Sequence, residues 1–151
     1  MSDIVSNPKA RRDYQITDTY EAGIVLKGTE VKSIRAGKAQ ISEAFARVEK
    51  GEVWLYNSHI EEYSHGNWMN HEPKSKRKLL LKKAQIRKLF DEATLKGNSL
   101  LPLKLYWKDG RVKVLLAVGK GKAARDKRQD MKERDSDREM KRAIMDAAKG
   151  R

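Results

Sequence analysis

An Asp-Gly turn between two alternating apolar runs limits most strongly how this chain can fold. Core-type residues recur at every second position on both sides of Asp109-Gly110: Leu103, Leu105 and Trp107 before it, and Val112, Val114, Leu116 and Val118 after it. Asp-Gly is favoured in two-residue hairpin turns because both positions adopt positive φ, and a period of two places the apolar side chains on one face. The pattern predicts an antiparallel hairpin with Leu103, Leu105 and Trp107 on one face.

Other short strand patterns lie upstream of this hairpin. Residues 45–48 and 53–56 flank a turn that contains Gly51, and glycines divide the apolar stretch at 24–34. Several short strands separated by glycine-bearing turns are typical of a small barrel or sandwich. We expect the aromatic rings on these strands to belong to the core: Trp54, Tyr56 and Trp107.

Two segments have helical spacing instead. Four apolar residues recur on one face of a predicted helix: Ile86, Leu89, Phe90 and Ala93. Gly97 follows at a position that suits a helix C-terminus. Residues 30–36 form either a short helix or a turn, which ends at Gly37. The expected fold class is therefore mainly β with flanking helices.

The net charge indicates the kind of partner. Lys and Arg number 34 against 21 Asp and Glu, which gives a formal charge of +13 in 151 residues. Such an excess predicts a polyanionic partner, with nucleic acid first and an anionic membrane surface second. The absence of cysteine excludes a disulfide, a Cys-ligated zinc site and a thiol nucleophile. No apolar run approaches the ~20 residues of a transmembrane helix and no signal peptide is evident, so we expect a cytoplasmic protein without a membrane partner.

Composition divides the chain into three zones, which we take as its predicted domain organisation. Residues 1–13 are a basic N-terminal arm, and residues 14–119 hold nearly all the aromatic and β-branched side chains. Residues 120–151 hold 12 Lys or Arg, 7 Asp or Glu and no aromatic residue. Because this basic tail has little to bury, we expect it to be disordered in solution and to become helical on a partner. Gly119 and Gly121 predict a flexible junction before it.

Two patterns resemble enzyme motifs but lack the context that the chemistry needs. His59, His65 and His71 lie near acidic residues without H-E-x-x-H spacing, so a polar loop is favoured over a metal site. Residues 119–124 imitate a G-x-G-x-x-A dinucleotide fingerprint, yet no helix and second strand follow. The sequence predicts no catalytic residue, no cofactor and no metal. A nuclease is the enzymatic alternative, and it would need a clustered acid set.

Basic clusters carry more information. Eight Lys or Arg and no acid lie between Pro73 and Phe90: Lys74, Lys76, Arg77, Lys78, Lys82, Lys83, Arg87 and Lys88. Two smaller clusters are Lys9, Arg11 and Arg12, and Lys32, Arg35 and Lys38. Lys and Arg at this density neutralise phosphates and gain from counterion release. Tyr14 and Trp68 lie beside polar or basic residues, where aromatic rings can stack on RNA bases.

Ordered segments along nearly the whole chain resemble the SmpB family, the SsrA-binding proteins. The matching segments are NPKARRDY (7–14), EAGIVL (21–26), GTEVKS (28–33), RAGK (35–38), HEP (71–73), RKLLL (77–81), PLKLY (102–106), GRVKV (110–114) and DKR (126–128). The resemblance implies an OB-like antiparallel β-barrel with flanking helices and a C-terminal tail. It also implies a non-enzymatic factor that binds transfer-messenger RNA (tmRNA) and delivers it to stalled bacterial ribosomes for trans-translation, that is, ribosome rescue.

The mechanism implied by the resemblance is tRNA mimicry. The barrel replaces the anticodon arm that the tRNA-like domain of the RNA lacks. The tail enters the small-subunit decoding centre and the mRNA channel of the ribosome, where it becomes helical. We expect a monomer, with one copy per RNA. The alternative that charge and fold alone equally permit is a generic OB-fold RNA-binding or ribosome-associated protein.

The basic clusters and the resemblance together give the predicted site residues. The RNA-binding residues are Asn7, Lys9, Arg11, Arg12, Tyr14, Glu21, Gly23, Lys32, Arg35, Lys38, Lys76, Arg77, Lys78, Leu80 and Lys82. The tail residues expected at the decoding centre are Lys120, Lys122, Arg125, Asp126, Lys127 and Arg128. The roles of Glu21 and Leu80 are implied by the resemblance. The chain departs from the family pattern at Arg12, Lys82 and Arg125, where His or Asn is more usual.

Overall fold

The computed structural model describes residues 2–65 and 70–121. Its strands are β1 (Ser2–Ser6), β2 (Tyr14–Ile24), β3 (Ala39–Gln40), β4 (Phe45–Glu49), β5 (Glu52–Tyr56), β6 (His59–Ile60), β7 (Arg77–Leu80), β8 (Ser99–Lys108) and β9 (Arg111–Gly121). Its helices are α1 (Pro8–Asp13), α2 (Gly28–Arg35) and α3 (Lys83–Phe90), and α3 continues into the π-helical segment η1 (Asp91–Leu95).

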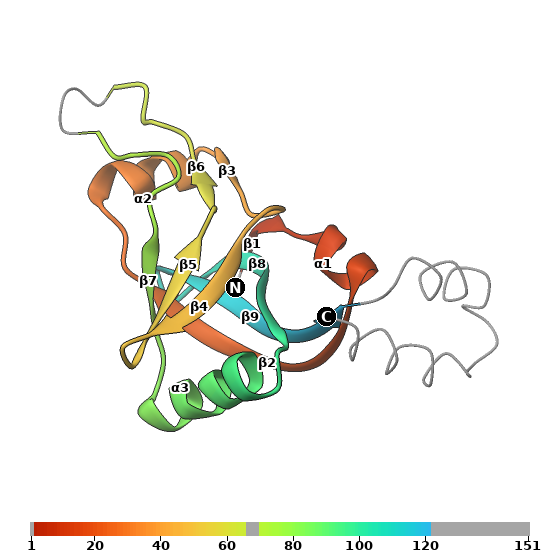
Figure 1. Ribbon diagram of the computed structural model, residues 1–151. Coiled ribbons are helices and arrows are strands. Elements are labelled where there is room, and N and C mark those ends of the chain that lie inside the picture. Colours follow the sequence, from red (N-terminus) through yellow and green to blue (C-terminus); the bar gives the residue numbers. More distant parts are fainter. Residues whose placement is uncertain (1, 66–69, 122–151) are drawn as a thin grey trace.

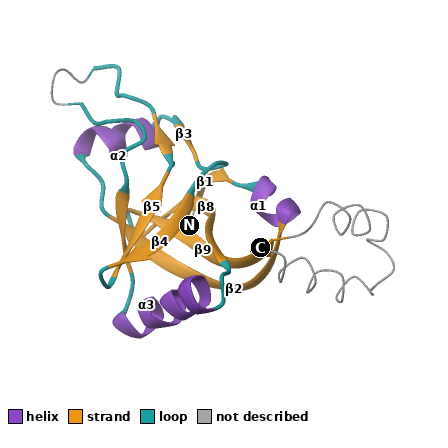
Figure 2. Cartoon of the chain, in the orientation of Figure 1, coloured by secondary structure: helices purple, strands orange, loops and turns teal. Residues whose placement is uncertain are grey.

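Six strands close an antiparallel barrel. Their order is β8-β4-β5-β7-β2-β9, and β9 pairs again with β8 to complete the ring. Closure between β4 and β8 runs through the pair Ala46–Leu100. A closed barrel leaves few free strand edges. The strands occupy the centre of the molecule and the helices lie around them (Figures 1 and 2), which confirms the predicted mainly-β barrel with flanking helices.

The two predicted hairpins and the predicted helix that contains Ile86 and Leu89 are confirmed. Asp109 and Gly110 have φ values of 53° and 76°, and Lys50 and Gly51 have 51° and 77°. Two successive positive φ values mark the turn type whose twist matches that of antiparallel strands. Within the segment 30–36, which the sequence left open, the chain is helical as far as Arg35, in α2.

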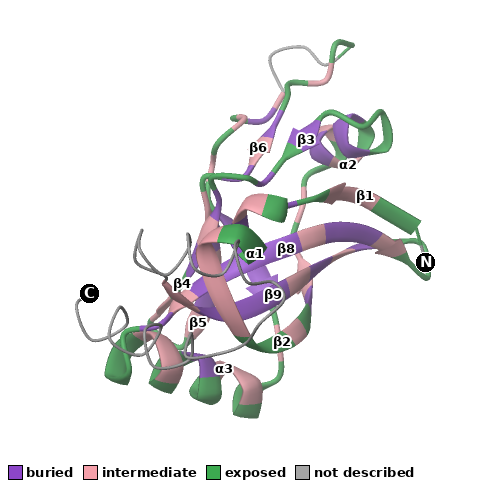
Figure 3. Cartoon of the chain, turned by 90° about the vertical axis from the view of Figure 1, so that its right-hand side faces the viewer, coloured by how far each residue is buried: buried purple, intermediate pink, exposed green. Residues whose placement is uncertain are grey.

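The barrel interior holds the main apolar core. Its largest fully buried side chains come from strands, helices and connecting segments: Ile34, Ile41, Leu55, Ile60, Leu79, Leu89, Leu100, Leu105 and Leu116. A second, smaller cluster lies outside the barrel wall, where Ala10 of α1 packs on Leu101, Leu103 and Ala117. Figure 3 shows long buried stretches along β8 and β9, while the outer side of α3 is exposed.

A β-bulge in β8 corrects the prediction that three alternating residues share one face. The register with β9 shifts between Pro102 and Lys104, so one extra residue is inserted there. Leu103 therefore packs in the smaller cluster under α1, whereas Leu105 and Trp107 face the main core. A single extra residue reverses the side-chain parity of everything beyond it. The alternation alone carried no sign of that insertion.

The prediction for the aromatic residues is wrong at two of three positions. Val53 and Leu55 fill the barrel, so the residues that alternate with them, Trp54 and Tyr56, lie half-buried on its outer surface. Trp107 is partly buried against the core, as expected. Either face of an alternating strand can be the inner one when both are apolar. Here the more compact aliphatic residues occupy the interior.

Both ends of the barrel zone are more ordered than the composition suggests. Residues of the predicted N-terminal arm form β1, which pairs with β8, and α1. The predicted flexible junction is wrong, because Gly119 and Gly121 lie in β9 opposite Ile16 and Tyr14. A Cβ at Gly119 would lie 3.0 Å from that of Tyr14, so this position needs glycine for close packing. Lys120 likewise belongs to β9. The remaining tail residues and Trp68 lie outside the described part of the chain.

In residues 2–65 and 70–121, no three His, Cys, Asp or Glu side chains gather in a metal-binding arrangement. No helix within those ranges is long and apolar enough to cross a membrane. His71 is buried, with Nδ1 2.8 Å from the Thr29 hydroxyl and Nε2 2.8 Å from the Ile60 carbonyl. That histidine therefore joins the loop to α2 and β6.

Candidate nucleic-acid interface

Many of the predicted RNA-binding residues gather near the two ends of β2. Tyr14 begins the strand and Gly23 nearly ends it, so the two places are about 30 Å apart along the strand. One group lies around α1: Asn7, Lys9, Arg11, Arg12 and Tyr14. The other lies around the ends of β2 and β7: Glu21, Gly23, Lys78, Leu80 and Lys82. We call them the α1 group and the β2–β7 group.

Glu21 is the most constrained side chain of the β2–β7 group. The Tyr106 hydroxyl donates to its Oε2 at 2.5 Å, and Lys108 Nζ lies 3.2 Å from both carboxylate oxygens. The hydrogen bond from Tyr106, and then that from Lys108, lowers the pKa of Glu21 below its usual range. Burial, and then the bond to Glu21, raises the pKa of Tyr106. An ionised carboxylate is thereby held in one orientation on an exposed strand.

An apolar depression lies beside this carboxylate. Gly23 and Leu80 are register partners between β2 and β7, and half of the Leu80 side chain is exposed. A cavity of about 360 Å³ lies there, with Trp107 in its lining and Arg111 and Lys113 on the same lining. Such a depression with cationic neighbours suits a nucleotide whose phosphate lies against the cations.

Sequence reasoning missed four residues of this place, all from the β8–β9 hairpin: Tyr106, Lys108, Arg111 and Lys113. They follow from the fold, because the β2–β9 pairing brings this end of the hairpin beside Glu21 and Gly23. For the three basic residues among them, a signal was present in the sequence. Polar and basic residues crowd both sides of the Asp-Gly turn, as they do where a hairpin tip reaches a charged ligand.

Arg77, assigned to RNA by the sequence, is buried and structural. Its Nε donates to Glu30 Oε2 at 2.6 Å, and both side chains are almost fully enclosed. Its Nη1 donates to Ser58 and to the Ser75 carbonyl, and its Nη2 to the carbonyls of Glu72 and Pro73. Because all of these partners are internal, Arg77 cannot meet a phosphate. The prediction for this residue is therefore wrong.

The neighbours of Arg77 on both sides remain accessible. Lys76 Nζ lies 4.5 Å from the ring centroid of Trp54, and Lys78 Nζ lies 2.8 Å from Glu52 Oε2. Lys82 is exposed at the start of α3, where its backbone N–H donates to Gln85. Exposed ion pairs are weak in water, so these amines can exchange a carboxylate for a phosphate.

The basic residues of α2 and the turn after it are also exposed. Arg35 lies 5.6 Å from the ring centroid of Trp107, which connects it to the β2–β7 group. Lys32 lies over the Tyr63 ring at 5.4 Å, and Lys38 is 4.0 Å from a Glu61 oxygen. This third cluster therefore extends the cationic surface from the cavity beside Leu80 toward α2 and the segment after β6.

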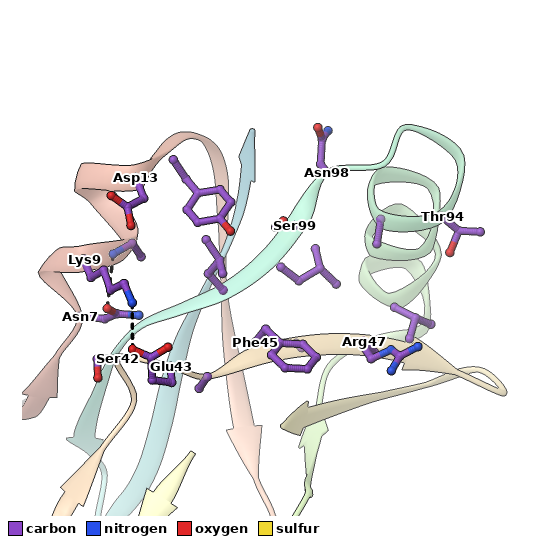
Figure 4. A pocket seen from close by; sticks show the side chains of 18 residues that line it. Asn7, Lys9, Asp13, Ser42, Glu43, Phe45, Arg47, Thr94, Asn98 and Ser99 are labelled. Carbon is purple, nitrogen blue, oxygen red and sulfur yellow. Dashed lines mark hydrogen bonds and ion pairs between the residues drawn. The ribbon is translucent and has the colours of Figure 1, made fainter. Parts of the chain in front are cut away.

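The α1 group borders a larger cavity of about 720 Å³ between α1, β4, β8 and η1. In Figure 4, Lys9 and Glu43 lie on one side of it and Thr94 lies on the other, while Phe45 and Arg47 project from β4. Lys9 Nζ is 2.8 Å from Glu43 Oε2, and this contact raises the pKa of Lys9. Tyr14 also lines the cavity. Arg11 and Arg12 are exposed beside it.

Asn7 is a second correction to the predicted RNA-binding residues. It is buried, and its Nδ2 donates to the carbonyls of Ile41 (3.2 Å) and Pro102 (2.9 Å). Its Oδ1 accepts from the backbone N–H of Ala10, which caps the first turn of α1. The side chain has no polar atom left for RNA. It fixes α1, and with it the exposed arginines, onto the barrel.

Known proteins resemble this chain along nearly its whole length. The family model described as SmpB protein matches residues 4–146. The chain belongs to the SmpB family. An SsrA-binding protein of Frankia casuarinae is 52% identical over 148 residues, covering 98% of this chain and 93% of that protein. An SsrA-binding protein of a Geobacillus species is 56% identical over 146 residues, covering 97% and 94%.

A solved structure supports the same assignment at the level of the fold. A chain from a structure described as "tmRNA-SmpB: a journey to the center of the bacterial ribosome" superposes with a TM-score of 0.68 at 47% identity. The match covers 86% of this chain and 94% of that SmpB chain. The barrel with its flanking helices is therefore the SmpB fold.

Proposed function

We propose that this SmpB-family chain binds tmRNA and supports trans-translation on stalled bacterial ribosomes, as an RNA-binding factor and not as an enzyme. The observation that carries the proposal is the match to SsrA-binding proteins at 52–56% identity along nearly the whole chain. The solved relative, described as tmRNA-SmpB, supports the same pair of partners, the RNA and the ribosome.

The β2–β7 group is the surface we assign to the tRNA-like domain of the RNA. Glu21 offers an oriented carboxylate that can accept from the N–H edge of a base or from a ribose 2′-hydroxyl. Leu80 and the cavity beside it take up apolar surface of the same nucleotide. Lys78, Arg111 and Lys113 neutralise phosphates around it. This set brings a hydrogen-bond acceptor, an apolar contact and cations together in one place.

Two other parts of the chain, the exposed arginines of α1 and the tail, are assigned to the ribosome. Arg11 and Arg12 of α1 and the basic tail are proposed to face ribosomal RNA, with the barrel in place of an anticodon arm. The tail assignment rests on Lys120, Lys122, Arg125, Asp126, Lys127 and Arg128. We propose that residues 120–151 enter the decoding centre and the mRNA channel and become helical there. The site of action would be the cytoplasm, with one monomer per RNA.

A competition experiment tests the function. The labelled tRNA-like domain of tmRNA is bound at physiological salt and challenged with a large excess of bulk tRNA. We expect the labelled complex to survive, because oriented contacts such as those of Glu21 add specificity to the charge attraction. Free displacement by bulk tRNA would favour the alternative, a generic OB-fold RNA-binding protein that binds many RNAs with similar affinity.

A further inference from the structure

The outside of the barrel carries a group of aromatic and basic side chains. Only two of them, both lysines, are among the predicted RNA-binding residues. Its side chains come from β4, β5 and β7 and from the segment before β7: Phe45, Arg47, Trp54, Tyr56, Lys76 and Lys78. We call this set the aromatic face. The cross-strand pairs Phe45–Tyr56 and Arg47–Trp54, together with the pair Trp54–Lys78, place these residues side by side. All point away from the core that Val53, Leu55 and Leu79 fill.

The rings of this face form a prepared stacking surface. Phe45 and Tyr56 are stacked, with centroids 5.5 Å apart and planes 8° apart. Tyr56 is further fixed by its hydroxyl, which donates to Glu49 at 2.7 Å. Trp54 lies on the same outer row of β5 as Tyr56 and is only half-buried. Rings that are already ordered lose little conformational freedom when a base stacks on them.

Cations surround these rings. Lys76 Nζ lies 4.5 Å from the Trp54 centroid and 5.8 Å from that of Tyr56, and the Arg47 guanidinium lies 5.7 Å from the Tyr56 centroid. The side chains of Arg47 and Lys76 are about 61% and 48% exposed. Both can move to a neighbouring phosphate, since their contacts with the rings and with Glu49 are exposed and therefore weak. The face therefore offers stacking and charge together, as single-stranded RNA requires.

The aromatic face is continuous with the β2–β7 group. Lys78 and Leu80 are two residues apart on β7 and so point to the same outer side, with Leu79 between them in the core. Trp54 pairs with Lys78 and Gly23 pairs with Leu80. From strand spacing and rise, the Cα atoms of Trp54 and Leu80 are about 8 Å apart. One RNA strand that contacts Leu80 can therefore continue directly onto Trp54.

We propose that the aromatic face binds an unpaired nucleotide of the same RNA, with its base stacked on Trp54 and its flanking phosphates on Arg47 and Lys76. This extension rests on the proposed function of the β2–β7 group. The acids at the edge are already paired, Glu49 with Tyr56, Arg47 (3.9 Å) and Lys76 (3.6 Å), and Glu52 with Lys78. A phosphate on Arg47 or Lys76 therefore replaces an exposed ion pair, which is weak in water. The competing explanation is that these rings only stabilise the β4–β5 hairpin as cross-strand pairs.

The test compares two substitutions at Trp54 in the full chain. Trp54→Phe keeps a ring, and Trp54→Leu keeps apolar bulk without one. We expect Trp54→Leu to weaken binding of the tRNA-like domain about tenfold, because it removes one base stack, and Trp54→Phe to stay close to wild type. The salt dependence should not change, because stacking releases no counterions. The matched control is Phe90→Leu, which removes an exposed ring of α3 that is not part of the aromatic face, with unaltered affinity expected.

A second measurement covers the case in which Trp54→Leu fails to fold. Tryptophan fluorescence of the wild type is followed on addition of a short oligouridylate and of a duplex of equal length. Quenching by the single strand, absent with the duplex and absent in Trp54→Phe, supports the proposal. If folded Trp54→Leu binds like wild type while Glu21→Gln is still weakened, the aromatic face is overturned and the proposed function stands. If the wild type does not prefer tmRNA over bulk tRNA, the proposed function itself fails.

Discussion

Two contacts between a carboxylate and a cation in this molecule differ in burial and in how completely the cation is paired. Glu30 meets Arg77 inside the protein, where both side chains are almost completely enclosed and every nitrogen of the guanidinium donates to an internal partner. Glu21 meets Lys108 on the surface, where the amine is nearly half exposed. Charge in a buried place demands complete pairing, whereas charge on the surface is free to exchange partners.

The comparison explains why a cluster of basic residues does not act as one unit. Lys76, Arg77 and Lys78 are consecutive, yet only the two lysines reach solvent. Arg77 instead ties α2 to the segment before β7, because Glu30 also accepts from the backbone N–H of Lys27 at the start of α2. The same carboxylate thus caps a helix and neutralises a buried guanidinium. On β7, the inward residues Arg77 and Leu79 stabilise the fold, and the outward residues Lys78 and Leu80 are those we assign to RNA.

The largest expected effect comes from breaking the buried contact. Arg77→Ala leaves Glu30 buried without its cation and should cost about 3–5 kcal/mol of unfolding free energy. Arg77→Lys should also be destabilising, because one amine cannot replace the planar set of donors. Urea unfolding measures both. Lys78→Ala, one residue along and on the outside, is the control and should unfold like wild type; equal destabilisation of the two alanine variants would contradict the comparison.

A middle-sized effect is expected from the surface cations of the β2–β7 group. Lys78→Gln combined with Lys113→Gln should weaken tmRNA binding and flatten its logarithmic salt dependence by about 0.7–0.9 for each phosphate that is no longer neutralised. Unfolding should be little changed. The matched control is Lys96→Gln, whose amine pairs with Glu92 on η1. A salt dependence identical to that of the wild type would remove these lysines from the interface.

The smallest expected effect is a change in the pKa of Glu21, the carboxylate of the exposed contact. Because the pKa of Glu21 is lowered first by Tyr106, Tyr106→Phe should move it upward toward the usual carboxyl range. In the wild type, the contribution of this group to stability is present above its unfolded pKa and is lost as pH falls through the lowered folded pKa. In the variant, this contribution should be smaller, and its loss should be complete at a higher pH than in the wild type. Carbon-detected NMR titration of the Glu21 carboxyl measures the midpoint.

The control for that titration is Tyr20→Phe. The Tyr20 hydroxyl donates to Asp18 at 3.1 Å, so its removal should leave the Glu21 midpoint in place. A midpoint that does not move in Tyr106→Phe would show that Lys108 alone sets the charge of Glu21. Such a result would make the orientation of this carboxylate looser than the structure indicates.

Local signals made the fold largely predictable. The two hairpins follow from turns whose residues tolerate positive φ, and α3 follows from apolar spacing, because both depend on neighbours in sequence. The bulge at Leu103 does not, since it is a register shift between β8 and β9 that neither the turn residues nor the apolar alternation marks. The outward position of Trp54 was hidden for a related reason: both faces of β5 are apolar, and only packing decides which one turns inward.

The interface was predictable in part. Family resemblance pointed to Glu21 and Leu80, which lie close together on the outside of the barrel. Net charge could not separate the accessible Lys78 from the buried Arg77. One local clue existed: Arg77 shares its strand face with Leu79, a core-type residue, whereas Lys78 shares its face with Leu80. Tyr106 carried no sequence signal for its role, because its hydroxyl reaches Glu21 across 85 positions of chain. Contacts of that span depend on the closed barrel.

The pairing of Gly121 with Tyr14 limits how far the residues after Gly121 can extend from the barrel. Everything after Gly121 is tethered at one fixed place on the barrel, beside the end of α1. Residues 122–151 can extend at most about 100 Å from that anchor, and about 45 Å if fully helical. Once the barrel is seated on its RNA, the local concentration of the tail is set by this tether and not by diffusion from solution. Lengthening or displacing the tether would change where the tail can act without altering any of its contacts.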